Sequence, residues 1–223
     1  MNGLFMTGTD TDVGKTWVGR YIIKSLVKRG VNIVPRKPIE SGWPAVEADL
    51  QSTDAHTLAS AAGVIDQLNS VCPYRFEAAL SPVRAARMEN QALTLSDLEA
   101  HCSQNLGTND FLYVEGAGGF YSPLVEDGLN ADLASRLKLP LVLVANNKLG
   151  CMSQILLCCE AIERRQLKLA AIVLNQVNET PLDTAMNNEE DLKDYLSYPI
   201  FSLNHQQSTL PSPLIDLLYL PVT

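Results

Sequence analysis

The feature that most constrains the fold is a polar, glycine-containing loop between an apolar strand and a helix near the N-terminus. Residues 4–6 are apolar, residues 8–16 read Gly-Thr-Asp-Thr-Asp-Val-Gly-Lys-Thr, and a helical pattern follows at once. Such a loop offers backbone N–H groups and a helix N-terminus to an anion, while its Lys reaches terminal phosphates and its Thr hydroxyl ligates Mg²⁺. The order of strand, loop and helix predicts a phosphate site and disfavours a tight turn with an incidental lysine.

The glycine spacing of this loop is unusual. The common phosphate-binding loop has a glycine six residues before its lysine. Counting back from Lys15, that position is Thr9, and the glycine stands one residue earlier, at Gly8. The loop therefore belongs to a variant of the motif.

Composition indicates a globular chain without a nucleic-acid surface. The 223 residues carry a formal net charge of -8, which argues against a polyanionic partner, and their number suits one domain over residues 1–223. The five cysteines contain no Cys-x-x-Cys pair, which favours free thiols in a reducing compartment. We find neither a signal peptide nor an apolar run near the ~20 residues that span a bilayer. We therefore expect a cytoplasmic protein without a membrane partner.

Apolar runs alternate with helical patterns along the chain, as in an α/β protein. The predicted strands are residues 4–7, 31–36, 111–115, 139–145 and 169–175, and the predicted helices are residues 16–29, a segment after Thr94, 152–165 and 189–196. Residues 178–191 and 204–212 are expected to be loops or edges. The pattern predicts a single-domain P-loop NTPase-like fold, with a mostly parallel β-sheet flanked by helices on both faces. Ligands then bind at the carboxyl ends of the strands.

The second predicted strand runs into Lys37 and Ser41. Pro38 keeps Lys37 out of helical geometry, which places its side chain at the strand end, beside the phosphate loop. Lys37 is then either a second cation for phosphate chemistry or a solvated lysine in a Pro-Gly turn. Ser41 is a candidate hydroxyl contact to substrate. Spacing alone leaves both interpretations open.

Two carboxylates are candidate ligands of Mg²⁺, an ion that prefers a few hard oxygens together with phosphate oxygens. Asp54 follows Ser52-Thr53, either of which could cap a helix, so its carboxylate either complements the helix dipole or binds the ion. Glu115 closes an apolar strand, and the glycine-rich residues 116–119 that follow let backbone approach a ligand closely. An acidic residue at such a strand end holds Mg²⁺ in many P-loop proteins.

Taken together and in this order, the motifs resemble those of the dethiobiotin synthetases. They are the loop at residues 8–16, residues 37–42 (Lys-Pro-Ile-Glu-Ser-Gly), Asp54, Ser81-Pro82, residues 115–119 (Glu-Gly-Ala-Gly-Gly) and residues 148–151 (Lys-Leu-Gly-Cys). The resemblance implies a ligase that joins 7,8-diaminopelargonate and CO₂ at the expense of ATP, with Mg²⁺. Its product is dethiobiotin, in the penultimate step of biotin biosynthesis.

The resemblance also implies roles for individual residues. The catalytic residues would be Lys15 and Lys37, and the Mg²⁺ ligands Thr16, Asp54 and Glu115. Nucleotide contacts would come from Asp12, Val13, Gly14, Lys15, Thr16, Trp17, Asp54, Glu115, Gly116, Ala117, Gly118, Asn175, Gln176 and Asn204. Substrate contacts would come from Thr11, Lys37, Ser41, Gly150, Cys151 and Ser153, in a homodimer whose substrate site lies at the subunit interface.

The chain departs from the family pattern at three places. Ser153 stands where some relatives have Asn, Gln176 stands where Asp is expected, and residues 201–204 replace a Gly-x-Ile-Pro pattern. These changes affect one substrate contact and the side of the site that recognises the base.

Other classes remain as alternatives. A switch ATPase of the same P-loop class usually carries a second lysine five residues before the loop lysine, and here that position is Asp10. Cobyric-acid and cobyrinate synthases add a glutamine-amidotransferase domain, for which the chain is too short. A nucleotide-binding interaction module would lack substrate-dependent release of phosphate.

Overall fold

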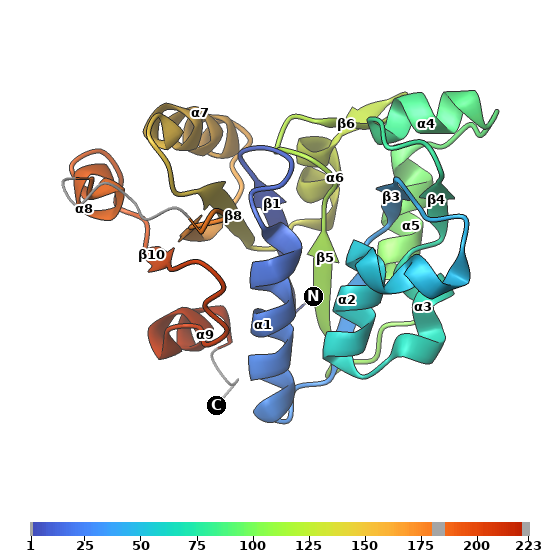
Figure 1. Cartoon of the computed structure of the whole chain (residues 1–223), viewed down its shortest axis with the longest axis horizontal. Helices are drawn as coiled ribbons and strands as arrows, with labels where there is room; N and C mark the ends of the chain where they lie inside the picture. The colour runs from blue at the N-terminus through green and yellow to red at the C-terminus, as the bar shows by residue number, and fades with distance from the viewer. Residues whose placement is uncertain (1, 180–185, 220–223) are drawn as a thin grey trace.

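The computed structural model describes residues 2–179 and 186–219, and at its centre lies a six-stranded sheet (Figure 1). All neighbouring strands of this sheet are parallel, in the order β10-β9-β8-β1-β5-β2. The strands are β1 (Gly3–Gly8), β2 (Ile33–Arg36), β5 (Phe111–Glu115), β8 (Leu141–Asn146), β9 (Leu169–Asn175) and β10 (Ile200–Leu203). The predicted mostly parallel sheet is confirmed.

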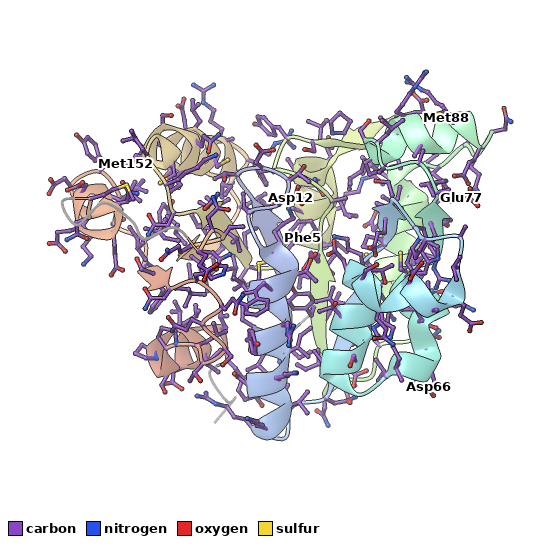
Figure 2. The ribbon with its side chains drawn as sticks, viewed as in Figure 1. Phe5, Asp12, Asp66, Glu77, Met88 and Met152 are labelled. Carbon is purple, nitrogen blue, oxygen red and sulfur yellow. The ribbon has the colours of Figure 1, made fainter. Side chains whose placement is uncertain are left out.

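Helices cover both faces of the sheet, because successive residues of each buried strand point to opposite sides. Leu4 and Met6 pack with α1 (Lys15–Lys28), α2 (Asp54–Ala62) and α9 (Ser212–Leu218). Phe5, labelled in Figure 2, points to the other face. The elements packed in that second core are α4 (Pro82–Met88), α5 (Leu95–Ser103), α6 (Asn130–Leu137), α7 (Cys151–Arg164) and α8 (Asn188–Lys193).

Smaller elements lie outside the central sheet. β3 (Ile39–Ser41) pairs in parallel with β4 (Tyr74–Phe76), and β6 (Pro123–Val125) pairs antiparallel with β7 (Gly128–Leu129). The 3₁₀ turns Glu47–Ser52 and Ile65–Gln67 and the short helix α3 (Leu68–Val71) flank α2. The capping box expected at Thr94 is present at the start of α5, since the Thr94 N–H donates to the Asp97 carboxylate and the Asp97 N–H donates to the Thr94 hydroxyl.

Three sequence expectations need correction. The loop expected at residues 178–191 is helical from Asn188, where α8 begins, while residues 180–185 lie outside the described residues. The helix expected to reach residue 196 ends at Lys193. β10 and α9 were not predicted, because four and seven residues give too little hydrophobic periodicity. No helix within residues 2–179 and 186–219 is long and apolar enough to cross a membrane.

Strand register brings the predicted site residues to one edge. Arg36 of β2 lies beside Val114 of β5, so Lys37 follows at the level of Glu115. Met6 of β1 lies beside Glu115, and the phosphate loop leaves β1 two residues later. The carboxyl ends of β1, β2 and β5 therefore converge, as expected for ligand sites in open α/β sheets.

Candidate active site

The phosphate loop closes over the start of α1 through two glycines. Gly14 has φ +89° and precedes the first helical residue, and a Cβ on it would lie 2.2 Å from Asn175 Nδ2. Asn175 Nδ2 in turn donates to the Val13 carbonyl at 3.1 Å. A Cβ on Gly8 would lie 2.8 Å from Val13 Cγ2. At Gly8, the glycine with the unusual spacing, the side chain of Val13 on the far side of the loop therefore leaves no room for a Cβ.

Lys15 lies under this loop and is largely buried. Its Nζ donates to the Asp10 carbonyl at 3.0 Å. Burial lowers the pKa of Lys15, and the nearby ammonium of Lys37 lowers it further. Two cations therefore share a small volume, which is favourable only where anionic groups accompany them. Figure 2 labels Asp12 in the same loop, at the N-terminal end of α1.

Lys37 forms the centre of a buried ionic cluster. Its Nζ lies 2.6 Å from Asp54 Oδ2 and 2.9 Å from Glu115 Oε1, and it also donates to the Gly116 carbonyl at 3.2 Å. Its side chain is 3% exposed, that of Glu115 0% and that of Asp54 40%. Burial acts to lower the pKa of Lys37, but the carboxylates of Asp54 and Glu115 outweigh it and raise the pKa above its ordinary value.

The carboxylates respond to the same charges. Burial acts to raise the pKa of Asp54, but Lys37 and the Thr16 hydroxyl outweigh it and hold that pKa below its ordinary value. Burial raises the pKa of Glu40 to about 7, although Lys37 opposes that shift. The cluster thus pairs Lys37 with ionised Asp54.

Thr16 completes an oxygen set that fits Mg²⁺. Its Oγ1 lies 2.6 Å from Asp54 Oδ1 and 2.7 Å from Glu115 Oε1. A hydroxyl has one hydrogen, so it can donate to only one of these carboxylates, and the second short oxygen–oxygen distance is of the kind found between ligands of one cation. Octahedral Mg²⁺, with ligands at about 2.0–2.1 Å, holds neighbouring ligand oxygens about 2.9 Å apart. Among residues 2–179 and 186–219 there is no group of three His, Cys, Asp or Glu that could hold a metal ion by itself.

A cavity of about 500 Å³ opens beside this cluster. The predicted site residues that line it are Thr11, Asp12, Gly14, Lys15, Thr16, Lys37, Ser41, Asp54, Ala117 and Gly118. Ser41 Oγ donates to the Leu80 carbonyl at 2.6 Å, within the wall of this cavity. The residues of the phosphate loop and three of the six predicted substrate contacts, Thr11, Lys37 and Ser41, are therefore brought together.

The predicted base-side residues lie nearer the end of β9. Asn175 closes that strand, and Gln176 follows with its N–H bonded to the Leu203 carbonyl. Asn204 comes directly after β10, and its N–H donates to Gln207 Oε1 at 3.0 Å. Trp17 lies on α1, with its ring edge-on to Tyr21.

The remaining predicted substrate contacts lie at the start of α7. Gly150 caps this helix with φ +85°, Cys151 is buried, and Ser153 Oγ donates to the Gly150 carbonyl at 3.3 Å. They do not line the cavity at the phosphate loop. Leu149 is 89% exposed and Leu157 67% exposed beside them, so this end of α7 presents apolar surface.

Two residues of the site were missed from the sequence. Glu40 lines the cavity, and both its oxygens accept hydrogen bonds from the start of α2. Asn130, fully buried, ties down the glycine-rich loop by donating to the Ala117 and Gly119 carbonyls. Glu40 stands in the polar run that contains Lys37, which was the available signal, whereas no local pattern marks Asn130.

The fold and this site define a P-loop nucleotide-binding protein. A family model described as an AAA domain matches residues 2–205. The ATP-dependent dethiobiotin synthetase BioD of Vesicomyosocius okutanii is 34% identical over 204 residues, which cover 92% of this chain and 90% of that protein. Its counterpart in Anaeromyxobacter dehalogenans (strain 2CP-C) is 40% identical over 176 residues, covering 79% and 77% of the two chains.

The chain belongs to the ATP-dependent dethiobiotin synthetase family. It is an ATP-dependent ligase of biotin biosynthesis, and the resemblance found in its motifs is confirmed. Among solved structures, the signal recognition particle receptor FtsY of Elizabethkingia anophelis aligns with 97% of this chain and 65% of that chain. Its identity is 13% and its TM-score 0.49.

Proposed function

We propose that this chain converts 7,8-diaminopelargonate, CO₂ and ATP into dethiobiotin, ADP and phosphate with the aid of Mg²⁺. One substrate amine adds to CO₂ and loses a proton, giving a carbamate. A carbamate oxygen then attacks the γ-phosphorus, and the bond to the ADP oxygen breaks. The second amine attacks the carbamate carbon, loses its proton and closes the ureido ring as phosphate leaves.

The observation that carries this proposal is the placement of Lys37. Its ammonium lies beside the phosphate loop and contacts the half-exposed Asp54 and the buried Glu115, in a cavity that Ser41 and Thr11 also line. Carbamate and triphosphate are both anions, so bringing them together needs cations that are already in place. Lys15 would hold the terminal phosphates, while Lys37 would contact the carbamate and the γ-phosphate. Their effect is positioning and charge stabilisation, without a covalent intermediate on the protein.

The proposed Mg²⁺ ligands are Thr16, Asp54 and Glu115, supported by the convergence of their oxygens. Mg²⁺ held by these residues would supply positive charge that offsets the negative charge of the phosphate groups during the transfer. The N–H groups of residues 12–16 contribute further positive ends of dipoles at the start of α1.

The base of ATP would lie on the side of Gly14 where β9 ends. A Cβ at Gly14 would meet Asn175 Nδ2 at 2.2 Å and Trp17 Cβ at 3.9 Å, so these two residues flank the same point of the loop. Asn175, Gln176 and Asn204 offer amide donors and acceptors to a base edge, and Trp17 offers an aromatic wall.

We also propose a homodimer in which the start of α7 contributes to the partner's substrate site. Gly150, Cys151 and Ser153 lie away from the phosphate-loop cavity, and Leu149 and Leu157 expose apolar surface beside them. A second copy would cover that surface. Sedimentation at micromolar concentration should give a dimer, and a single 24.4 kDa species would refute it.

The direct test is to incubate the protein with 7,8-diaminopelargonate, bicarbonate and Mg²⁺-ATP and to detect dethiobiotin by mass. Omission of any one component should abolish the product. Lys37→Ala should nearly abolish turnover while ATP binding persists, because Lys15 and the loop remain. Product formation without ATP, or wild-type turnover in the Lys37 variant, would contradict the proposal.

A further inference from the structure

Glu40 contributes a third carboxylate to the cluster around Lys37, but it bonds to backbone rather than to the cations. Its Oε1 accepts from the Asp54 N–H at 2.7 Å, and its Oε2 accepts from the Ala55 N–H at 3.0 Å. The residue lies on β3 and is 8% exposed. The Glu40 carboxylate thus accepts hydrogen bonds from the N–H groups of the first two residues of α2.

With these two hydrogen bonds, each of the first N–H groups of α2 has a hydrogen-bond partner within the protein. The Thr53 N–H donates to the Leu50 carbonyl, and the His56 N–H donates to Thr53 Oγ1 at 3.2 Å. Glu40 takes the two N–H groups that lie between them in the chain. The first N–H groups of a helix usually need such partners or an anionic ligand. Here the protein supplies every partner, so the end of the helix fixes Asp54 and does not bind phosphate.

Most of the chain that enters α2 is exposed. Residues 45–49 and 51–52 do not pack against the core, whereas Thr53 is buried and caps α2 by accepting the His56 N–H. The Asp54 side chain nevertheless has to place one oxygen 2.6 Å from Lys37 Nζ and the other 2.6 Å from Thr16 Oγ1. Lys37 and Glu40 lie three residues apart, so one segment holds Asp54 by its side chain and by its backbone.

We propose that Glu40 is a positioning residue for the Mg²⁺ site, because it fixes the backbone from which Asp54 reaches Thr16 and Lys37. The inference rests on the proposed role of Asp54 as a metal ligand. Without Glu40, α2 can shift or fray at its first turn, and the Asp54 carboxylate loses its fixed distance to the other oxygens. Partners that orient a metal ligand change metal affinity by about 10–100-fold when they are removed.

The test measures Mn²⁺ binding in the presence of ADP by the electron paramagnetic resonance signal of free Mn²⁺. Glu40→Ala should raise the dissociation constant of Mn²⁺ by about tenfold or more. The dissociation constant of Glu40→Gln should fall between those of Glu40→Ala and the wild type, because the glutamine keeps one accepting oxygen and turns the other position into an NH₂ group, which cannot accept from the second N–H. In turnover assays the Mg²⁺ concentration for half-maximal rate should rise in the same order.

Asp97→Asn is the matched control. Asp97 also accepts a backbone N–H at a helix N-terminus, in the capping box of α5, away from the cavity. This variant should lose thermal stability while its Mn²⁺ affinity stays that of the wild type. A folded Glu40→Gln variant with wild-type Mn²⁺ affinity and wild-type Mg²⁺ dependence would overturn the proposal, even if Glu40→Ala fails to fold.

The measurement needs no diamine, so it separates this inference from the proposed reaction. A wild-type protein that binds Mn²⁺ with ADP but makes no dethiobiotin would refute the reaction and leave the role of Glu40 testable.

Discussion

Replacing Lys37 by Met should destabilise the metal-free protein strongly, because one ammonium compensates two carboxylates. Methionine keeps the unbranched stem but removes three hydrogen bonds, to Asp54, Glu115 and the Gly116 carbonyl. Asp54 is 40% exposed and regains solvation, so its share is small. Glu115 has no exposed side-chain surface and stays behind as a buried charge.

The size of the stability loss is set by Glu115, because Asp54 can be solvated and Glu115 cannot. Removing one partner of a buried ion pair costs about 3–5 kcal/mol. Glu115 keeps the Tyr113 hydroxyl at 3.1 Å, and the Thr16 hydroxyl, 2.7 Å away, can turn its one hydrogen to Glu115 while Asp54 is solvated, which favours the lower end of that range. We therefore expect a loss of about 3 kcal/mol, which for a chain of this size lowers Tm by about 6–12 °C.

The assay is a double-mutant cycle in urea, without metal or nucleotide. Lys37→Met, Glu115→Gln and the double variant are compared with the wild type by the free energy of unfolding. In the double variant no uncompensated charge remains at the Glu115 position, so it should recover more than half of the loss caused by Lys37→Met. A Lys37→Met variant as stable as the wild type, or a double variant with simply additive losses, would refute the reasoning.

Three further outcomes test other parts of the structure. Glu115→Gln should raise the Mg²⁺ concentration needed for half-maximal turnover by about tenfold or more, and an unchanged Mg²⁺ dependence would remove Glu115 from the metal site. Gly14→Ala should weaken ADP binding and lower stability, because its φ is +89° and its Cβ would lie 2.2 Å from Asn175 Nδ2. Gly63→Ala, with φ +75° and no atom within 4 Å of the new Cβ, should lower stability alone, and equal ADP affinities in the two variants would contradict this. Burial lowers the pKa of His101 to about 4, so the unfolded chain binds its proton first as pH falls. As pH falls from 6.5 to 4, the free energy of unfolding should therefore decrease by up to about 3 kcal/mol more in the wild type than in His101→Gln. Urea unfolding at a series of pH values measures this, and parallel plots of the free energy of unfolding against pH for the two proteins would refute it.

The residues predicted from the sequence carry local signals. Pro38 keeps Lys37 at a strand end, Thr53 caps the helix that Asp54 begins, and Glu115 closes an apolar strand. Parallel strands bring their carboxyl ends to one edge, so three local signals on separate segments meet in space. The fold class and the phosphate loop were predictable from local signals as well, the fold class from the hydrophobic patterns of successive segments and the loop from residues 8–16 between a strand and a helix.

The parts that were missed depend on contacts between distant segments. Glu40 bonds to backbone 14 and 15 residues later, and Asn130 bonds to a loop 11 and 13 residues earlier. Neither residue differs in type or spacing from an ordinary polar residue. The short elements β10 and α9 form because they pack against β9 and α1, and isolated segments of that length are not stable.

Lys37 pairs with two carboxylates in the metal-free protein, but those carboxylates are also the proposed ligands of Mg²⁺. We therefore predict that Mg²⁺ displaces the Lys37 ammonium from them. The oxygens that hold its ammonium, Asp54 Oδ2 and Glu115 Oε1, belong to the carboxylates proposed to bind Mg²⁺. A divalent and a monovalent cation 4 Å apart repel by about 8 kcal/mol at an effective dielectric of 20. When Mg²⁺ arrives with nucleotide, the Lys37 ammonium should therefore leave the carboxylates and turn toward the position of the γ-phosphate, a group that ADP lacks. Lys37→Met removes the competing cation, so this variant should bind Mg²⁺-ADP more tightly than the wild type, and its loss of stability should shrink as Mg²⁺-ADP saturates. Calorimetric titration measures the first effect and urea unfolding the second, with ADP and a chelator as the control. Weaker Mg²⁺-ADP binding by the folded variant would show that Lys37 and the metal do not compete for these carboxylates.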